Sequence, residues 1–462
     1  MGHCMRSHHV IVDQQSEAAR EAQEIVAKNL EYTLFSWSVQ SVANPIPVAR
    51  AQGSCFWDVE GKRYLDFSAQ LMNMNIGHGH PKVIEAIKKQ ADELAFIYPG
   101  CATKPRGEAG EKLSKISPGN LKKVFFTNGG TDAIENAMKM ARLVTGRQKV
   151  MTRYRAYHGA TFAAMSAGGD PRRLANEPGV PWIVRMLDPY AYRSPLYRHC
   201  TPEQGDQALV DLIEEQIEME GPNDIAAILL EGYSGSSGII APSTDVYWKG
   251  IRRLCDKYGI KLIVDEVMSG FGRTGEWWGI DHYGVQPDIL VCAKGLTCGY
   301  IPLGAVVVSP EIGDYFDNRP LWCGLTYSSH PIACAAASAC IDVYTEDNLI
   351  ENTRVQGAKV AKLMDELQAK HKCVGDHRGI GLFRVLELVK NKETKEPISG
   401  FNKPASEAMA KVAGHLKARG LSTQVRWDWI FVVPPLCITE AEVEEGMSII
   451  DEALSLADPY CD

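Results

Sequence analysis

The chain has 462 residues, which is too long for one simple core and predicts two or three domains. Apolar residues make up 45% of it and charged residues 23%, as in an ordinary soluble globular protein. Its net charge of -8 argues against nucleic acids and anionic membrane surfaces as partners. The longest apolar stretches are shorter than the ~18 residues of a membrane span, so no membrane segment is expected.

The thirteen cysteines are scattered along the chain without a C-x-x-C pair. Metal ligation needs Cys or His at short spacings, so no metal site is expected. Free thiols inside apolar runs indicate a reduced, cytoplasmic protein. The first ten residues, MGHCMRSHHV, lack the apolar core of a signal peptide. Their histidines point to an artificial extension, and we assign them no function.

The N-terminal part predicts a helix, a hairpin and a second helix. Residues 15–32 carry apolar and charged residues at helical spacing. The sequence GSCFWDVEGKRYLDFS then predicts two short strands joined by a turn at its Glu-Gly pair. Residues 68–75, SAQLMNMN, are expected to form a strand, and the following NIGHGHPKVIEAIKKQ leads into a helix that begins near Pro81.

A glycine turn between a strand and a helix is the first candidate binding site. Residues 123–130, KVFFTNGG, predict the strand and the turn, and Thr131 and Asp132 can cap the helix that follows. Free backbone N–H groups and the helix dipole converge at such a helix N-terminus and favour an anion. A Gly-Gly pair alone is equally typical of a plain tight turn.

The middle of the chain predicts two more strands. One strand precedes AYHGAT, in which Tyr157 and His158 by themselves would be an ordinary packed aromatic edge. Residues 168–200 are rich in Pro and Arg and show no periodicity, so we expect a long surface excursion there. Residues 226–230 predict a buried strand that ends at Glu231.

Two further apolar runs each stop at one charged residue. Residues 262–264 end at Asp265, and residues 289–293 end at Lys294. Short uninterrupted apolar runs suit strands buried on both faces of a parallel sheet. Ligands of open α/β sheets bind at the carboxyl ends of such strands. The acid and the lysine are therefore placed to hold one ligand.

The chemistry of a lysine and an acid in such a place points to a cofactor. Burying an ammonium alone is costly, but a lysine with a lowered pKa can form a Schiff base. Pyridoxal phosphate (PLP) needs that lysine, together with an acid that keeps its pyridine nitrogen protonated. A buried Asp and Lys can equally be a structural ion pair, so this pair alone does not decide.

The surrounding motifs resemble one enzyme family. IVDEVMSGFGRTG followed by PDILVCAKGLTCGYIPLGAV is similar to the class III PLP-dependent aminotransferases of fold type I, and the resemblance covers about residues 57–439. It implies an α/β fold with a large, mainly parallel sheet and a smaller α/β domain built from both terminal segments. The implied divisions are residues 1–70 for the N-terminal part of the small domain, 71–340 for the large PLP-binding domain and 341–462 for the C-terminal part.

The resemblance also implies roles for the cofactor site. Lys294 would bind PLP covalently, and Asp265 would hold its pyridine nitrogen. Glu231 would orient this site or be purely structural. The remaining cofactor contacts would be the phosphate loop Gly129, Gly130 and Thr131, the stacking Tyr157 with its neighbour His158, and Val267 on the opposite ring face. The family often has Ser at position 129 and Glu at position 132, but these departures leave the backbone donors intact.

Further residues are implied for substrates and for a partner subunit. GLTYSSHP resembles the family stretch whose threonine reaches the other subunit's cofactor, which makes Thr326 a trans ligand in a homodimer or a dimer of dimers. Arg426, in TQVRWDWIFVVPPLCIT, would bind a substrate carboxylate. Leu71 and Met72 stand where many ω-transaminases have a bulkier Leu-Trp pair. Arg155 replaces a small polar residue and would be either an extra substrate donor or a solvated surface residue.

The implied activity is transamination in two half-reactions through pyridoxamine phosphate. LFSWSVQ and FSAQLMNMNIGHGHP most resemble the taurine–oxoacid members, so we expect taurine as amino donor and 2-oxoglutarate or pyruvate as acceptor. The alternatives are β-alanine or 4-aminobutyrate as donor, another PLP enzyme such as an aminomutase, racemase or decarboxylase, or a non-catalytic dimeric scaffold. Lys294, Asp265 and the phosphate loop together argue against the scaffold.

Overall fold

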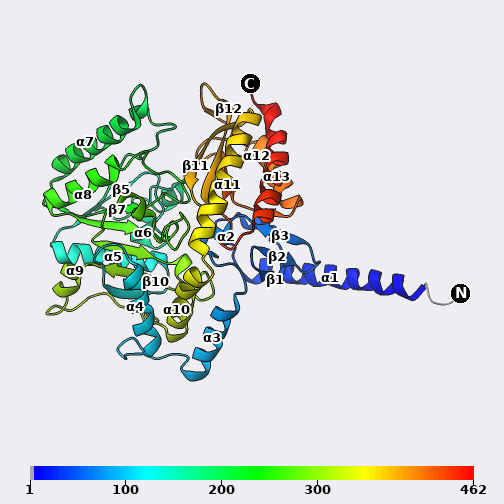
Figure 1. The fold of residues 1–462 in the computed structure, drawn as a ribbon, viewed down its shortest axis with the longest axis horizontal. Helices are drawn as coiled ribbons and strands as arrows, with labels where there is room; N and C mark the ends of the chain where they lie inside the picture. Colours follow the sequence, from blue (N-terminus) through cyan, green and yellow to red (C-terminus); the bar gives the residue numbers. More distant parts are fainter. Residues whose placement is uncertain (1–4) are drawn as a thin grey trace.

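A computed structural model describes residues 5–462, with side chains from residue 17 onward. The histidine-bearing first ten residues therefore lie outside the described side chains. The predicted N-terminal helix is present as α1 (Met5–Tyr32), which begins earlier than expected and projects from the body of the molecule (Figure 1). No helix among the described residues is long and apolar enough to cross a membrane.

A seven-stranded sheet organises the large part of the molecule, in the order β4-β10-β9-β8-β7-β5-β6. Only β10 runs antiparallel to its neighbours, and the other neighbouring pairs are parallel. The mainly parallel α/β sheet implied by the sequence is confirmed. Its strands are β4 (Lys123–Thr127), β5 (Lys149–Arg153), β6 (Ile183–Met186), β7 (Ile225–Glu231), β8 (Lys261–Asp265), β9 (Ile289–Cys292) and β10 (Gly304–Val308).

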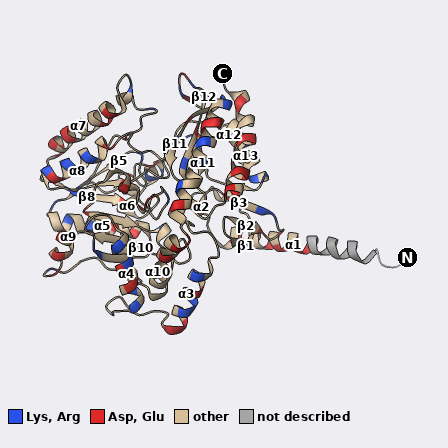
Figure 2. Cartoon of the chain, in the orientation of Figure 1, with Lys and Arg blue, Asp and Glu red and all other residues tan. Residues whose placement is uncertain are grey.

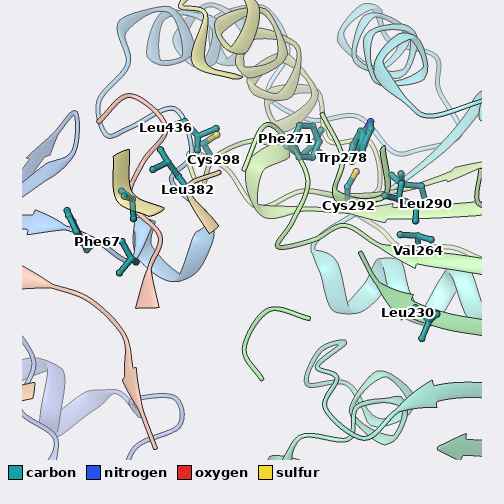
Figure 3. Close-up of a cluster of buried hydrophobic side chains, with 14 of the residues drawn as sticks. Phe67, Leu230, Val264, Phe271, Trp278, Leu290, Cys292, Cys298, Leu382 and Leu436 are labelled. Atoms are coloured by element: carbon teal, nitrogen blue, oxygen red, sulfur yellow. The ribbon is translucent and has the colours of Figure 1, made fainter. Parts of the chain in front are cut away.

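The central strands are apolar throughout because both faces of the sheet are covered. Alternate residues of β7, β8 and β9 pack into two different hydrophobic clusters, as the two-residue period of a strand requires. Helix α5 (Gly130–Thr145) lies against one face. On the other face, Leu230, Val264 and Leu290 belong to one cluster with Phe271 and Trp278, whose ring centroids are 4.8 Å apart. Figure 3 shows Cys292 beside these rings and Leu230 farther from them.

Two smaller sheets complete the core. One has the order β1 (Val48–Gln52), β2 (Cys55–Asp58), β3 (Arg63–Asp66) and β14 (Leu421–Ser422), so it joins both terminal segments of the chain. The other has the order β11 (Val374–Ile380), β12 (Phe383–Asn391), β16 (Trp429–Val432) and β15 (Val425–Arg426), with β13 (Glu396–Pro397) paired to β12. This sharing matches the smaller domain implied by the sequence, whose boundaries stay a prediction.

The remaining helices surround the sheets, and Lys, Arg, Asp and Glu lie mainly on them while the strands are mostly uncharged (Figure 2). They are α3 (Pro81–Glu93), α4 (Lys104–Ile116), α6 (Phe162–Ala167), α7 (Pro202–Glu220), α8 (Val246–Tyr258), α9 (Pro310–Tyr315), α10 (Pro331–Glu346), α11 (Leu349–Lys370), α12 (Glu407–Ala418) and α13 (Glu440–Ala457). Short 3-10 turns span Gln40–Val42, Pro171–Asn176, Pro195–Tyr197, Gly279–Tyr283, Lys294–Leu296 and Asp458–Tyr460.

The strand expected over residues 68–75 is wrong, because a left-handed turn stands there. All four residues of α2 (Ala69–Met72) have positive φ, between 42° and 66°. The N–H of Met72 donates to the carbonyl of Ser68 at 2.8 Å, and that of Asn73 to Ala69 at 2.8 Å. L-residues in this conformation cost roughly 1–2 kcal/mol each. No glycine marks the turn, so its sequence reads as a strand.

Residues 168–200 are not wholly a surface excursion. They include the edge strand β6 and the 3-10 turn Pro171–Asn176, and their Asp170 and Tyr190 are buried. The β6 run is only four residues long, which is too short for a periodic signal. The strand forms because it pairs in parallel with β5, a contact that the local sequence does not show.

Candidate active site

A cavity of about 530 Å³ lies at the carboxyl ends of β7, β8 and β9, where sequence placed the ligand. The N-terminus of α5 and the left-handed turn also border it. Ten of the predicted site residues line this one cavity: Leu71, Gly129, Gly130, Thr131, Tyr157, His158, Glu231, Asp265, Val267 and Lys294.

Asp265 is held in place at the end of β8 by two donors. Its Oδ2 lies 2.7 Å from Nδ1 of His158, and its Oδ1 accepts the N–H of Val267 at 2.9 Å. The other ring nitrogen of His158 lies 3.3 Å from the hydroxyl of Thr152. These two contacts hold the buried carboxylate at the wall of the cavity.

Glu231 ends the neighbouring strand and positions the aromatic residue. Its carboxylate accepts the N–H of Tyr157 at 3.0 Å and that of Gly235 at 2.6 Å. Burial raises the pKa of Glu231, and the negative charge of Asp265 raises it further. Glu231 thus ties β7 to the loop that carries Tyr157, a contact the sequence does not show.

Lys294 follows β9 and begins a tight turn. Burial lowers the pKa of its amine, against the opposing charges of Asp265 and Glu231, and the nearby Arg172 lowers it further. Its backbone φ is 34°, and its carbonyl accepts the N–H of Cys298 at 2.7 Å. A lysine amine with a lowered pKa is more readily deprotonated and hence a better nucleophile.

The N-terminus of α5 is packed closely against the other strand ends. A Cβ on Gly130 would lie 3.1 Å from both γ-carbons of Val267 and 3.5 Å from Cβ of Ala293. Gly159, with φ 135°, has no room for a Cβ beside Thr131. The hydroxyl of Thr131 lies 2.7 Å from the hydroxyl of Thr161 and accepts the backbone N–H of Thr161 at 3.1 Å. At Gly129 a Cβ would meet nothing within 4 Å, and Gly129, Gly130 and Thr131 all line the cavity at this helix N-terminus, whose backbone N–H groups suit a phosphate.

Four predicted residues lie elsewhere. Met72 is only 1% exposed and packs in the apolar cluster with Tyr233 and Phe431, so it does not line the cavity. Arg155 is also outside the lining, with its guanidinium over the rings of Tyr190 and Phe401. Arg426 lies beside the cavity rather than in its lining, and Thr326 is exposed on the surface of this chain.

Three residues that the sequence did not single out for a role lie at or beside the cavity: Trp37, Asp170 and Arg172. Arg172 lies over the Tyr157 ring, 3.9 Å from its centroid, and 5.2 Å from the Trp37 ring centroid. Both rings line the cavity. Asp170 binds the Arg172 guanidinium at 2.7 Å and that of Arg426 at 2.8 Å. A signal existed, because Asp before Pro in GGDPRR is typical of a cap, and Asp170 does accept the N–H of Arg172.

The fold and these residues define an α/β enzyme that binds a phosphorylated aldehyde cofactor, and known proteins agree. A profile of the Aminotransferase class-III family matches residues 37–454. A taurine–pyruvate aminotransferase of Bilophila wadsworthia is 33% identical over 452 residues, covering 94% of this chain and 97% of the relative. A putrescine–pyruvate aminotransferase of Pseudomonas aeruginosa is 34% identical over 421 residues, covering 88% of this chain and 90% of the relative.

Solved structures agree as well. The structure of taurine:2-oxoglutarate aminotransferase from Bifidobacterium kashiwanohense, in complex with PLP and glutamate, matches with a TM-score of 0.92 at 41% identity. The match covers 95% of this chain and 98% of that one. The chain belongs to the class III aminotransferases, and its cofactor is PLP. The helix N-terminus at Gly129 and Gly130, the amine of Lys294 and the hydrogen-bonded carboxylate of Asp265 fit that group.

Proposed function

We propose that this aminotransferase takes the amino group of a short ω-amino acid, taurine in the first place, and passes it to 2-oxoglutarate or pyruvate. The observation that carries the proposal is the pair of guanidinium groups on one buried carboxylate. Arg172 and Arg426 both bind Asp170, and Arg172 also covers the Tyr157 ring that borders the cavity. This cluster supports an anionic group at the far end of the donor.

The charges of the cluster favour one added anion. Burial alone would raise the pKa of Asp170. Hydrogen bonds from Arg172 and the charge of Arg426 outweigh burial, so this pKa is lowered. Two guanidinium groups thus face one carboxylate, which leaves one positive charge unmatched among the described residues of the cluster. An unmatched charge on a partly buried guanidinium is costly, so an incoming anion gains from it. Amines that lack an anionic group do not gain this interaction.

A sulfonate fits this cluster at least as well as a carboxylate. It has three oxygens in a tetrahedral arrangement and accepts more weakly, so it needs more donors around it. Arg172 and Arg426 offer several N–H groups from different directions, and the cavity-lining Trp37 lies beside Arg172. Arg172 here takes the role of extra substrate donor, one of the two roles expected for Arg155. The taurine relatives support the same choice, and the putrescine relative favours a donor without an anion.

The cofactor end of the cavity is proposed to act as follows. When bound, PLP supplies the carbonyl that takes up the amino group and the ring that withdraws electrons. Lys294 would hold the cofactor covalently, and its amine would move a proton at the reacting carbon. Asp265, steadied by His158, keeps the pyridine nitrogen protonated. The backbone of Gly129, Gly130 and Thr131 binds the phosphate, and Tyr157 and Val267 enclose the ring.

Single-turnover kinetics of each half-reaction test the substrate proposal. Arg172→Ala should lower kcat/KM for taurine by roughly ten- to a hundred-fold, the effect of one lost charged hydrogen bond. Propylamine, which lacks the anion, should be affected far less. Arg426→Ala should in addition impair the oxoacid half-reaction, because the same group would take the acceptor's carboxylate. Arg155→Ala is the matched control and should leave both half-reactions unchanged.

Three outcomes decide against the proposal. Faster conversion of putrescine than of taurine and β-alanine by the unmodified protein would rule out an anionic donor. Equal losses for taurine and propylamine in Arg172→Ala would mean that the arginine does not bind the anion. A donor-specific loss in Arg155→Ala would return the role to that residue.

We further propose a homodimer in which Thr326 serves the neighbouring subunit. Thr326 is exposed and lies outside the cavity lining of its own chain. Around it lie exposed apolar side chains, and the rings of Phe96 and Tyr327 contact each other with centroids 6.0 Å apart. Exposed apolar side chains on two segments joined by such a ring contact are typical of an interaction site. The exposed members are Leu94, Phe96, Ile97, Tyr98, Trp322 and Tyr327.

Mixing two defective chains tests this arrangement. Thr326→Ala and Lys294→Ala should each be impaired alone. If the threonine acts in trans, a mixed dimer has one site with both lesions and one site with neither, so activity should partly recover after subunit exchange. No recovery, with heterodimers shown to form, would mean that Thr326 acts within its own chain.

A further inference from the structure

The left-handed turn Ala69–Met72 forms part of the cavity wall. Leu71 points its side chain to the cavity and is 44% exposed, and Gln70 and Asn73 also line it. Met72 is buried in the core on the other side. Four consecutive positive-φ residues without a glycine are costly, so they persist only where the surroundings over-determine them.

One buried carboxylate does most of this holding. Asp66 is 0% exposed and stands at the end of β3. Its Oδ1 accepts the N–H and hydroxyl of Ser68 at 3.1 and 3.0 Å, and the N–H of Gln70 at 3.4 Å. Its Oδ2 accepts the side-chain amide of Gln70 at 3.0 Å and lies 3.1 Å from Nε2 of His78. The backbone of His78 is paired to Gly53, so the carboxylate ties the turn to two separate segments.

The turn also lies directly on the loop that follows Lys294. A Cβ on Gly299 would collide with the side-chain amide of Asn73, and one on Gly295 would come within 2.6 Å of that of Asn75. The Asn75 amide also donates to the carbonyl of Phe271 at 3.2 Å. The position of the wall is therefore set relative to the reactive lysine.

We propose that Asp66 is a specificity-determining, positioning residue: it holds Ala69–Met72 left-handed and thereby fixes the Leu71 wall that limits the length of the amino donor. Asp66 does not line the cavity, so it acts through the turn. Without its carboxylate the turn relaxes toward ordinary backbone angles and the wall recedes. The proposed function, a short amino donor, enters this inference at one point only: it sets the direction in which selectivity should change.

The backbone conformation is tested by stability, with no activity needed. At position 71 glycine avoids the left-handed strain of alanine. Leu71→Gly should therefore unfold at a higher temperature than Leu71→Ala, on the order of 2 °C. At Lys88, an exposed position of α3, the order should be reversed, because alanine favours a right-handed helix. In an Asp66→Asn background the advantage of glycine at position 71 should shrink or vanish.

Donor selectivity is the second measurement. In PLP-loaded Asp66→Asn, the ratio of kcat/KM for β-alanine to that for 5-aminovalerate should fall about tenfold or more, since one methylene in a pocket is worth roughly 10–200-fold. The rate of the oxoacid half-reaction and the cofactor absorbance should stay close to those of the unmodified protein. A purely structural role would lower all rates together and leave the ratio unchanged.

The two measurements separate the possible failures. If the unmodified protein prefers 5-aminovalerate, the short-donor proposal fails. The comparison of Leu71→Gly with Leu71→Ala still tests whether the turn is strained. If Leu71→Ala is as stable as Leu71→Gly, the turn is not strained and the inference is overturned. An unchanged selectivity ratio in Asp66→Asn overturns it as well. Should Asp66→Asn not fold, the Leu71 pair and Ser68→Ala, which removes one bond to the same carboxylate, carry the same two tests.

Discussion

The two ends of the active-site cavity are built in different ways. At the cofactor end, Glu231 and Asp265 are the last residues of buried strands, Lys294 follows a third, and a helix N-terminus lies beside them. At the substrate end, Arg172, Arg426 and the left-handed turn come from short irregular segments. The cofactor end is fixed by the hydrogen-bonded sheet, whereas the substrate end is fixed by side-chain contacts to buried carboxylates, Asp170 and Asp66.

This difference separates the chemistry from the choice of substrate. A change at a strand end disturbs a group that the whole sheet positions, so it should abolish the reaction. A change at Asp170 or Asp66 alters one local contact and leaves the sheet intact, so it should alter the choice of substrate. One scaffold can thus keep its chemistry while the donor varies among relatives.

The largest expected effect is at Lys294. Lys294→Ala should lower turnover on the order of 10³-fold or more, because both the covalent hold and the proton transfer are lost. Borohydride reduction of the PLP-loaded protein should label the peptide that contains Lys294. Lys261, at the opposite end of β8 and paired with Glu311, is the matched control, and Lys261→Ala should keep its rate. A label on another lysine would contradict the assignment.

A smaller loss is expected at Asp265. Asp265→Asn should still bind cofactor but lower the rate by roughly 10²–10³-fold, because the ring nitrogen loses its charged partner. Asp288 is a matched carboxylate at the other end of the sheet, where it accepts the N–H of Leu262 at 2.7 Å and an Arg252 N–H at 2.9 Å. Asp288→Asn should lower the unfolding temperature without this loss of rate. Similar rate losses in Asp265→Asn and Asp288→Asn would mean that the loss at Asp265 is not specific to the cofactor end of the cavity.

The smallest effect is on stability and concerns Glu266, next to Asp265. Burial raises its pKa to about 7 from an ordinary 4.5. As pH rises between these values, the unfolded chain releases this proton before the folded one does, so the free energy of unfolding falls, by about 1–3 kcal/mol, and then levels off. Glu266→Gln should lack that fall. Parallel pH profiles of the unfolding temperature in the two proteins would show that Glu266 is ionised throughout.

Much of the cofactor end could be predicted because its signals are local. An apolar run that stops at a charged residue identifies a strand end, and parallel strands bring such ends together. Asp265, Lys294, Glu231 and the glycine turn therefore converge as expected. Their roles, the domain boundaries and the cytoplasmic location stay predictions.

The substrate end could not be predicted because its contacts are distant in sequence. Asp170 meets Arg426 across 256 positions, and nothing near either residue announces the other. Arg155 had the right charge near Tyr157, but strand β5 and its following loop direct it to Tyr190 and Phe401. The left-handed turn contains no glycine, and its bonds run to Asp66, which also contacts His78.

The small sheet that joins both ends of the chain has a consequence for folding during synthesis. β3 pairs with β14 through Leu65 and Leu421, and the carbonyl of Phe67 accepts the N–H of Val433 at 2.9 Å. These partners are synthesised late, because Leu421 comes 356 residues after Leu65. Until then the hairpin next to the left-handed turn keeps an open strand edge, which is prone to aggregation. Slow late pairing, rather than the large sheet, should therefore limit the yield of active protein.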